Sequence, residues 1–341
     1  MPTRRTLLAA SGAVLLHAAT GEGITGPIAR QASEHGRLTP DLLDAVEHAA
    51  TTARHLDERH GGGAALTWVG DQITTLLHLL DTTSYDLHQA RRLHTALAQL
   101  AQTAGFMAHD DAHDGPARRW YLIAHRAAHA AQDHALAASV LALMSNQATA
   151  RGDHPTALAL AQAADRAART APGLVRALVR ARGGLAHAAA GDTHAALTAH
   201  EQAHALLEAD EPAPDWADYV DDVEIDAIAG RGLVALGRTH RPDTATLLAR
   251  AVPLLSPRAY TDDHDVHQRS ALCHGAWLGL AHARASEPEQ AAEEVRRALR
   301  RLPEVHSTRT LGLLAALRTQ LVATPTPQVN KAVQELDRHL A

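Results

Sequence analysis

A small-residue pattern that recurs at intervals of roughly forty residues is the feature that most constrains the fold of this chain. Five alanines that open helical segments each follow a turn rich in Gly, Asp or Pro, and these are Ala117, Ala157, Ala196, Ala245 and Ala291. Residues 152–158 (GDHPTAL) and 191–197 (GDTHAAL) align almost letter for letter. A period of this length, filled with helix-forming residues, is typical of stacked helical hairpins.

The spacing of small residues matches the tetratricopeptide pattern. That pattern places a small residue about twelve positions before the alanine and another about seven after it, where two helices touch. Three copies fit, and they are Gly105/Ala117/Ala124, Gly184/Ala196/Ala203 and Gly279/Ala291/Ala298. Ser145 replaces the glycine in the copy around Ala157, and the copy over 225–255 is the loosest. We predict an all-α, tetratricopeptide-like helical-hairpin solenoid.

The composition agrees with a helical core. Hydrophobic residues make up 46% of the chain but aromatic residues only 3%, with a single Phe. Alanine has the best helix propensity, while the β-branched and aromatic residues of a sheet are scarce. The core is therefore expected to consist of Ala, Leu and Val on helices.

Turn and linker residues divide the chain into four parts. Residues 1–40 are a signal-like or linker segment, 41–104 the first helices of the array, 105–322 the repeats, and 323–341 a capping helix. Asp41 and Ser84 are predicted N-caps, and Gly61-Gly62-Gly63 is a predicted break between helices.

The N-terminal segment allows two interpretations. Arg4-Arg5 precedes an apolar stretch over residues 7–19, which is typical of a twin-arginine export signal. The stretch is too short to span a membrane as a helix, and His17 interrupts it. We expect a cytoplasmic protein with no membrane association, and an exported binding protein is the alternative.

The charge and cysteine content exclude several functions. A net charge of −6 with Arg interleaved among Asp and Glu argues against direct nucleic-acid binding, which needs clustered basic residues. Cys273 is the only cysteine, so neither an internal disulfide nor a cysteine zinc site is possible, and we expect a buried structural thiol.

One motif indicates metal chemistry. His200-Glu201-Gln202-Ala203-His204 is an H-E-x-x-H segment, which places two imidazoles on one helix face with a glutamate as general base. Glu224 is a candidate third ligand. Against a zinc hydrolase, the chain is rich in His, and Ala203 is the packing alanine of a repeat. The favoured interpretation is a solvated helix, with the hydrolase as the alternative.

Other sites carry weaker signals. Further histidines that could hold a metal adventitiously are His125, His129 and His134, the segment 109–114, and His264 with His267. The sequence holds no phosphate-binding loop, dinucleotide fingerprint or nucleophile elbow. We therefore expect no catalytic residues, no cofactor and no resident metal.

Arg118-Arg119-Trp120-Tyr121 stands out in a chain poor in aromatic residues. Trp120 and Tyr121 fit hairpin packing, and the alternative is an anchor set on a binding groove, because Arg and aromatic residues dominate binding energies. These four residues are the candidate ligand or partner groove.

Several segments in a fixed order resemble a known family. They are Leu56–Gly63, Leu100–Asp110, Ala117–Tyr121 and the turn at Gly152-Asp153. This series resembles the C-terminal sensor region of actinobacterial XRE-type transcriptional regulators, which pair a helix-turn-helix with tetratricopeptide-like repeats. Forty residues before the first predicted helix leave no room for that DNA-binding domain. The resemblance implies a regulatory array that binds a peptide, protein or small signal in its concave face, and a homodimer is possible.

Overall fold

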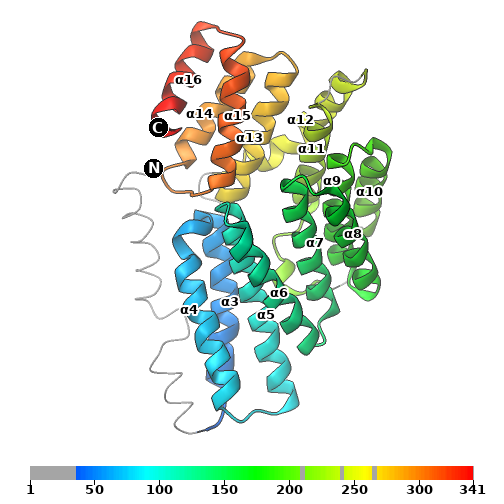
Figure 1. The fold of residues 1–341 in the computed structure, drawn as a ribbon, viewed down its shortest axis with the longest axis vertical. Coiled ribbons are helices and arrows are strands. Elements are labelled where there is room, and N and C mark those ends of the chain that lie inside the picture. Colours follow the sequence, from blue (N-terminus) through cyan, green and yellow to red (C-terminus); the bar gives the residue numbers. More distant parts are fainter. Residues whose placement is uncertain (1–35, 208–211, 239–241, 263–266, 341) are drawn as a thin grey trace.

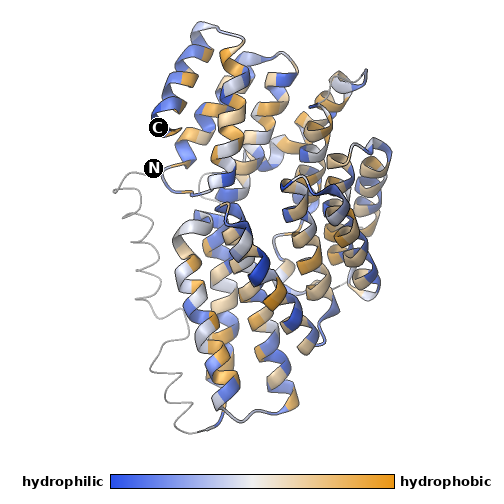
Figure 2. Cartoon of the chain, viewed as in Figure 1, coloured by the Kyte–Doolittle hydropathy of each residue, from blue (hydrophilic) through white to orange (hydrophobic). Residues whose placement is uncertain are grey.

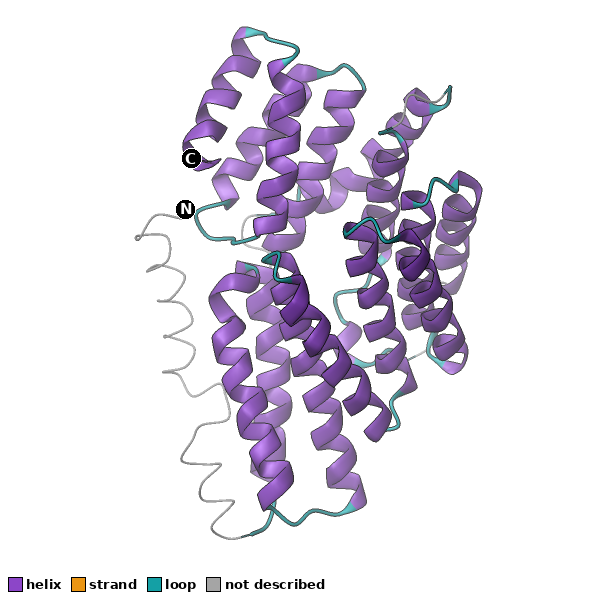
Figure 3. Cartoon of the chain, viewed as in Figure 1, coloured by secondary structure: helices purple, strands orange, loops and turns teal. Residues whose placement is uncertain are grey.

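The structure, a computed structural model, describes residues 36–207, 212–238, 242–262 and 267–340. These residues form α-helices and two short 3-10 helices, with no β-strand (Figure 3). The predicted all-α class is confirmed. The helices are α3 (Pro40–His60), α4 (Gly62–Thr82), α5 (Leu87–Asp110), α6 (Asp114–Ala130), α7 (His134–Ala150), α8 (His154–Ala167), η1 (Ala168–Thr170), α9 (Gly173–Ala189), α10 (Thr193–Leu207), η2 (Asp215–Ala217), α11 (Asp222–Leu236), α12 (Thr244–Ala259), α13 (Gln268–Arg284), α14 (Pro288–Arg301), α15 (Thr308–Val322) and α16 (Pro327–Leu340).

Consecutive helices pack as hairpins from α5 onward. The pairs are α5/α6, α7/α8, α9/α10, α11/α12, α13/α14 and α15/α16, and α3 and α4 both pack on α5 at the start. The odd-numbered helices also contact the next odd-numbered helix, so they form one continuous layer, called the inner layer here, on which the even-numbered helices pack. The helical-hairpin solenoid predicted from the repeat period is therefore present.

A recurrent turn joins helices along the array. Its last residue before the next helix cap has a left-handed backbone, at Gly152 (φ 75°) and Gly191 (φ 85°), as the two aligned repeats suggest. Ala112, Gln132 and Ser286 adopt the same conformation, with φ from 60° to 63°, although each carries a side chain. The turn is thus kept even where the sequence does not supply its glycine.

The small residues of the repeat lie where hairpin helices touch. A Cβ atom on Gly105 would lie 2.5 Å from the Tyr121 ring, and one on Gly184 would lie 3.1 Å from the Ala199 Cβ. Ser145, which replaces the glycine, donates a hydrogen bond of 2.8 Å to the Ala157 carbonyl. Ala245 opens α12 as predicted, but its side chain is exposed.

The first helix boundaries differ in detail from the sequence prediction. Thr39, not Asp41, caps α3, and its hydroxyl accepts from the Leu42 N–H. Asp86, not Ser84, caps α5 in a reciprocal capping box with Gln89. Both residues sit directly before the apolar periodic stretch of their helix and carry a short side-chain acceptor.

The triple glycine breaks the chain at one residue only. Gly61 has φ 75° and ψ 175°, a conformation essentially confined to glycine, whereas Gly62 begins α4. The predicted boundary between residues 104 and 105 falls inside α5. Residues 1–35, with the segment that resembles an export signal, lie outside the described residues.

The two ends of the inner layer meet. In Figure 1 the blue N-terminal helices lie end to end with the orange C-terminal helices, and α7 to α12 lie on the opposite side. The His306 N–H donates to the His60 carbonyl at 2.8 Å, and α3 contacts α13. Ser307 Oγ donates to Asp110 of α5 at 2.9 Å. The solenoid therefore curves into a ring around a central space.

Apolar side chains fill the space between layers rather than this centre. Most helices carry both hydrophobic and hydrophilic residues along their length (Figure 2). The buried core is largely Ala, Leu and Val, as the composition predicts. Across the described part of the chain, no helix combines the length and apolar content needed to cross a membrane.

Candidate ligand-binding cavity

The inner helices line an open cavity of about 830 Å³ at the centre of the ring. Its walls come from α5, α7, α9, α11, α13 and α15, which together supply Phe106, Asn146, Leu185, Arg231, Trp277 and Arg309 among others. This volume lies in the range of pockets that bury drug-sized ligands.

The cavity is basic although the chain is acidic overall. Five arginines and two aspartates line it, whereas the whole chain carries a net charge of −6. Two of the arginines are paired, Arg151 with Asp114 at 3.3 Å and Arg269 with Asp57 at 3.2 Å. The excess of guanidinium groups gives the central space a positive potential that favours anions.

Two of these guanidinium groups have no carboxylate partner among the described residues. The side chain of Arg231 donates a hydrogen bond of 3.5 Å to the side-chain oxygen of Asn146. Arg309 donates to Nδ1 of His109 at 2.9 Å. Burial, together with Arg309, lowers the pKa of His109 to about 3, so this acceptor is a neutral imidazole. Burial also lowers the pKa of Arg309.

Aromatic side chains provide flat apolar surface beside the basic groups. Phe106, the single Phe of the chain, lines the cavity, and the Arg269 guanidinium lies 4.5 Å from its ring centroid. Trp277 lines the same cavity from α13. A ligand with both an anionic group and an apolar body would find a partner for each part.

A smaller pocket of about 80 Å³ continues from the cavity between α3, α9 and α13. It shares Phe106, Asn146, Arg231, Arg269 and Cys273 with the larger space. Its wall contains buried polar atoms without a hydrogen-bond partner among the described residues, namely Gln102 Oε1, Arg182 Nη1 and His274 Nε2. Buried polar atoms are normally satisfied, so these three can serve a bound ligand or water.

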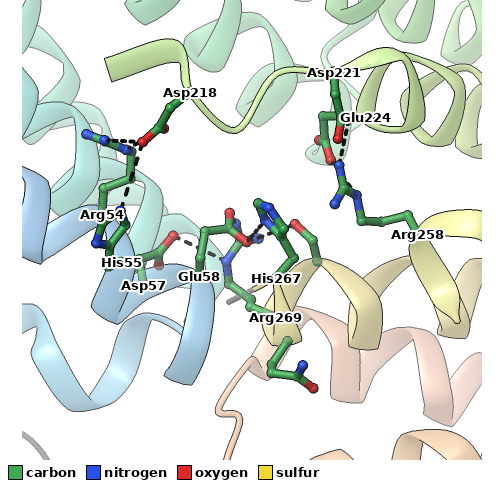
Figure 4. Close-up of polar contacts among 12 residues, drawn as sticks. Arg54, His55, Asp57, Glu58, Asp218, Asp221, Glu224, Arg258, His267 and Arg269 are labelled. Carbon is green, nitrogen blue, oxygen red and sulfur yellow. Dashed lines mark hydrogen bonds and ion pairs between the residues drawn. The ribbon is translucent and has the colours of Figure 1, made fainter. Parts of the chain in front are cut away.

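Arg269 closes the ring beside this pocket. It forms ion pairs with Asp57, at 3.2 Å, and with Glu58, both on α3 (Figure 4). Although burial opposes it, the guanidinium lowers the pKa of Glu58 to about 2. Burial raises the pKa of Asp57 to about 8, against the pull of Arg269. Glu58 is therefore the ionised partner, and Asp57 tends to keep its proton.

Two more arginines form ion pairs that hold the start of α11 and the segment before it against the ring. Arg54 of α3 binds Asp218 at 2.8 Å, and Arg258 of α12 binds Asp221 at 2.7 Å and Glu224 at 3.4 Å (Figure 4). Glu224 thus lies with Arg258. The prediction that Glu224 completes a metal site with His200 and His204 is wrong.

The H-E-x-x-H segment lies on α10, as predicted, and Ala203 is fully buried. His200 and His204 both point to Asp226 of α11, with Nε2 to Oδ1 distances of 2.8 and 2.7 Å. Glu201 is exposed. Asp226 replaces Glu224 as the neighbouring carboxylate because it lies on the side of α11 that packs on α10.

The four residues of the predicted groove lie on α6, in the outer layer. Tyr121 is fully buried against Gly105, whereas Arg118 and Arg119 are exposed. Trp120 is half-buried against the core. None of them lines the central cavity described above.

Other sequence candidates are also placed. Cys273 lines both pockets, and burial raises the pKa of its thiol. His125 and His129 pair on α6 at 3.3 Å, and His267 lies near Glu58. His264 is outside the described residues.

The arginines of the cavity could have been noticed in the sequence. Arg231, Arg269 and Arg309 recur roughly forty positions apart, one on each of three successive inner helices. A repeat of a charged residue at the period of the fold is a signal for a shared inner surface.

No family model matches the chain, and a search of curated proteins finds no match.

Proposed function

We propose that this chain is a regulatory ligand-binding protein whose central cavity takes an anionic peptide or small signal with an apolar body. It would correspond to the sensor half of an XRE-type regulator and act in the cytoplasm. The same cavity would serve the alternative of an exported binding protein.

The observation that carries this proposal is the pair Arg231 and Arg309. Burying a charge is costly unless it is paired, and Arg258 and Arg269 of this chain do have carboxylate partners. Arg231 and Arg309 are half-buried and instead face an amide and a neutral imidazole. A carboxylate, phosphate or sulfonate of a ligand would supply the missing negative charge, through hydrogen bonds of the strongest class.

The shape of the site supports binding of a small molecule or a short peptide. A volume of about 830 Å³ inside a ring accommodates a small ligand or a few residues, not a folded domain. Phe106 and Trp277 would contact the apolar part while the two guanidinium groups orient the anionic part.

A fluorescent anion tests the proposal directly. 8-Anilinonaphthalene-1-sulfonate combines a sulfonate with an aromatic body and becomes bright when enclosed. We expect the full chain to bind it, and R231Q/R309Q to bind it at least about tenfold more weakly, since one charged hydrogen bond is worth roughly 1.5–3 kcal/mol.

R118Q/R119Q is the matched control, because it removes the same charge from the exposed face of α6. Near-ultraviolet circular dichroism must show native packing in every variant, since this dye also binds partly folded states. Equal affinity for wild type and R231Q/R309Q would contradict the proposal. A loss of affinity for the dye found only in R118Q/R119Q would place the binding site on α6.

A further inference from the structure

A cluster of three potential metal ligands lies outside the central cavity, on two helices that belong to neighbouring repeats. His200 and His204 lie one turn apart on α10, and Asp226 lies on α11. Their ligating atoms all lie within 4.8 Å of one another. Within the described residues this is the one group of three or more His, Cys, Asp or Glu side chains with such an arrangement.

The atoms converge on one point. His200 Nε2 and His204 Nε2 lie 2.8 and 2.7 Å from the same oxygen, Asp226 Oδ1, and 3.1 Å from each other. Tetrahedral zinc, with bonds of about 2.0–2.2 Å, separates its ligand atoms by roughly 3.3 Å. The observed triangle thus needs to open by a few tenths of an ångström to hold the ion.

The surroundings suit an ion that enters from solvent. The side chains of His200, Asp226 and His204 are 16%, 29% and 40% exposed, so the cluster is accessible yet partly enclosed. Two imidazoles and one carboxylate form the ligand set that zinc and its first-row neighbours prefer, with water free to complete the coordination.

We propose that His200, His204 and Asp226 form a structural site for zinc or a similar divalent first-row metal ion, which ties α10 to α11. The ion would bridge two repeats that also pack directly on each other, through α9 with α11 and α10 with α11. The three ligands come from two helices of neighbouring repeats, so the role assigned to the site is structural.

The chain offers an internal control for this site. His125 and His129 on α6 have the same spacing, with their Nε2 atoms 3.3 Å apart. They belong to no cluster with a carboxylate among the described residues. An H129Q variant therefore removes one half of an equally spaced histidine pair without touching the proposed ligands.

Zinc titration of the tag-free full chain, stripped with a chelator and followed with a competing indicator, tests the site. We expect one tight zinc ion per chain, and a loss of affinity of about a hundredfold or more in both H204Q and D226N, because even outer-shell groups are worth 10–100-fold. H129Q should keep wild-type affinity. Cobalt should give the visible absorption bands of tetrahedral coordination in wild type and H129Q only.

Folding is monitored separately by far-ultraviolet circular dichroism without metal, and D226N preserves side-chain size if H204Q is unstable. Zinc should also raise the melting temperature of wild type and H129Q but not of D226N. Wild-type affinity no greater than that of D226N would overturn the proposal. So would an equal loss in H129Q, which would indicate adventitious binding by the many histidines.

Discussion

Arg269 of α13 donates a hydrogen bond to Glu58 of α3 across 211 positions of the chain. Both side chains are buried, and Asp57 shares the same guanidinium group. This contact joins the first helix of the inner layer to one of its last helices. It also forms part of the wall of the smaller pocket beside the central cavity.

Replacing Arg269 is expected to destabilise the protein far more than replacing an arginine whose partner is exposed. R269M leaves the buried carboxylate of Glu58 without its cation, which typically costs about 3–5 kcal/mol. Arg54 pairs with Asp218, which is 49% exposed, so R54M should cost roughly 1 kcal/mol or less. Chemical denaturation of both variants measures the difference, and equal costs would refute a special role for Arg269.

Asp57 should make the protein less stable as the pH rises. Its pKa is raised to about 8 in the folded state, so between pH 4 and pH 8 the folded chain holds a proton that the unfolded chain has lost. The free energy of unfolding then falls as the pH rises through this window. D57N should flatten the slope relative to wild type, and an unchanged difference between pH 5 and pH 8 would contradict the assignment.

Gly61 is expected to tolerate no side chain. A Cβ atom there would lie 2.0 Å from the His306 carbonyl oxygen, in addition to the strain of its positive φ. Gly152 has the same φ of 75° with nothing within 4 Å. G152A should therefore report the backbone strain alone, roughly 1–2 kcal/mol, and G61A should cost clearly more. Similar melting temperatures for the two variants would show that the backbone at His306 shifts easily to accept a side chain at position 61.

Ser286 and Gln132 are candidates for stabilising substitutions. Both hold a left-handed backbone in the recurrent turn, which strains a residue that has a side chain. S286G and Q132G should each raise the free energy of unfolding by roughly 0.5–1 kcal/mol, because glycine removes this strain at some entropic cost. Thermal denaturation provides the measurement, and destabilisation by both would argue against a shared turn.

His274 should make the protein sensitive to acid. Burial lowers its pKa well below the ordinary value, so below pH 6.5 the unfolded chain takes up a proton that the folded chain does not. H274L should lose less stability than wild type on going from pH 7 to pH 5. His339 is exposed yet bonds its i−4 carbonyl as His274 does, at 3.1 and 2.9 Å, so H339L is the control and should behave like wild type.

The parts of the fold that could be predicted depend on short-range spacing. A glycine or serine facing an alanine about twelve positions later sets each hairpin, and Gly184 and Ser145 both lie at such contacts. The observed N-cap residues lie two positions from the predicted ones. Several short polar side chains lie near the start of each helix, and only packing decides which of them accepts the first N–H.

The closure of the ring and the position of its cavity depend on the summed rotations between many successive hairpins. Small rotations between successive repeats add up before His306 can meet His60, and no local pattern encodes that total. The third neighbour of His200 and His204 depends on the register of α11 against α10, which selects Asp226 over Glu224 two residues away. Long-range geometry of this kind is absent from residue spacing alone.

The meeting of α3 with α13 changes how such an array should respond to heat or force. An open stack of repeats unfolds first at its ends, because a terminal repeat has a neighbour on one side only. Here the inner helices at both ends have neighbours on two sides, so no inner helix is a natural starting point for melting. We expect the array to lose its structure more nearly as one cooperative unit than as a series of independent repeats.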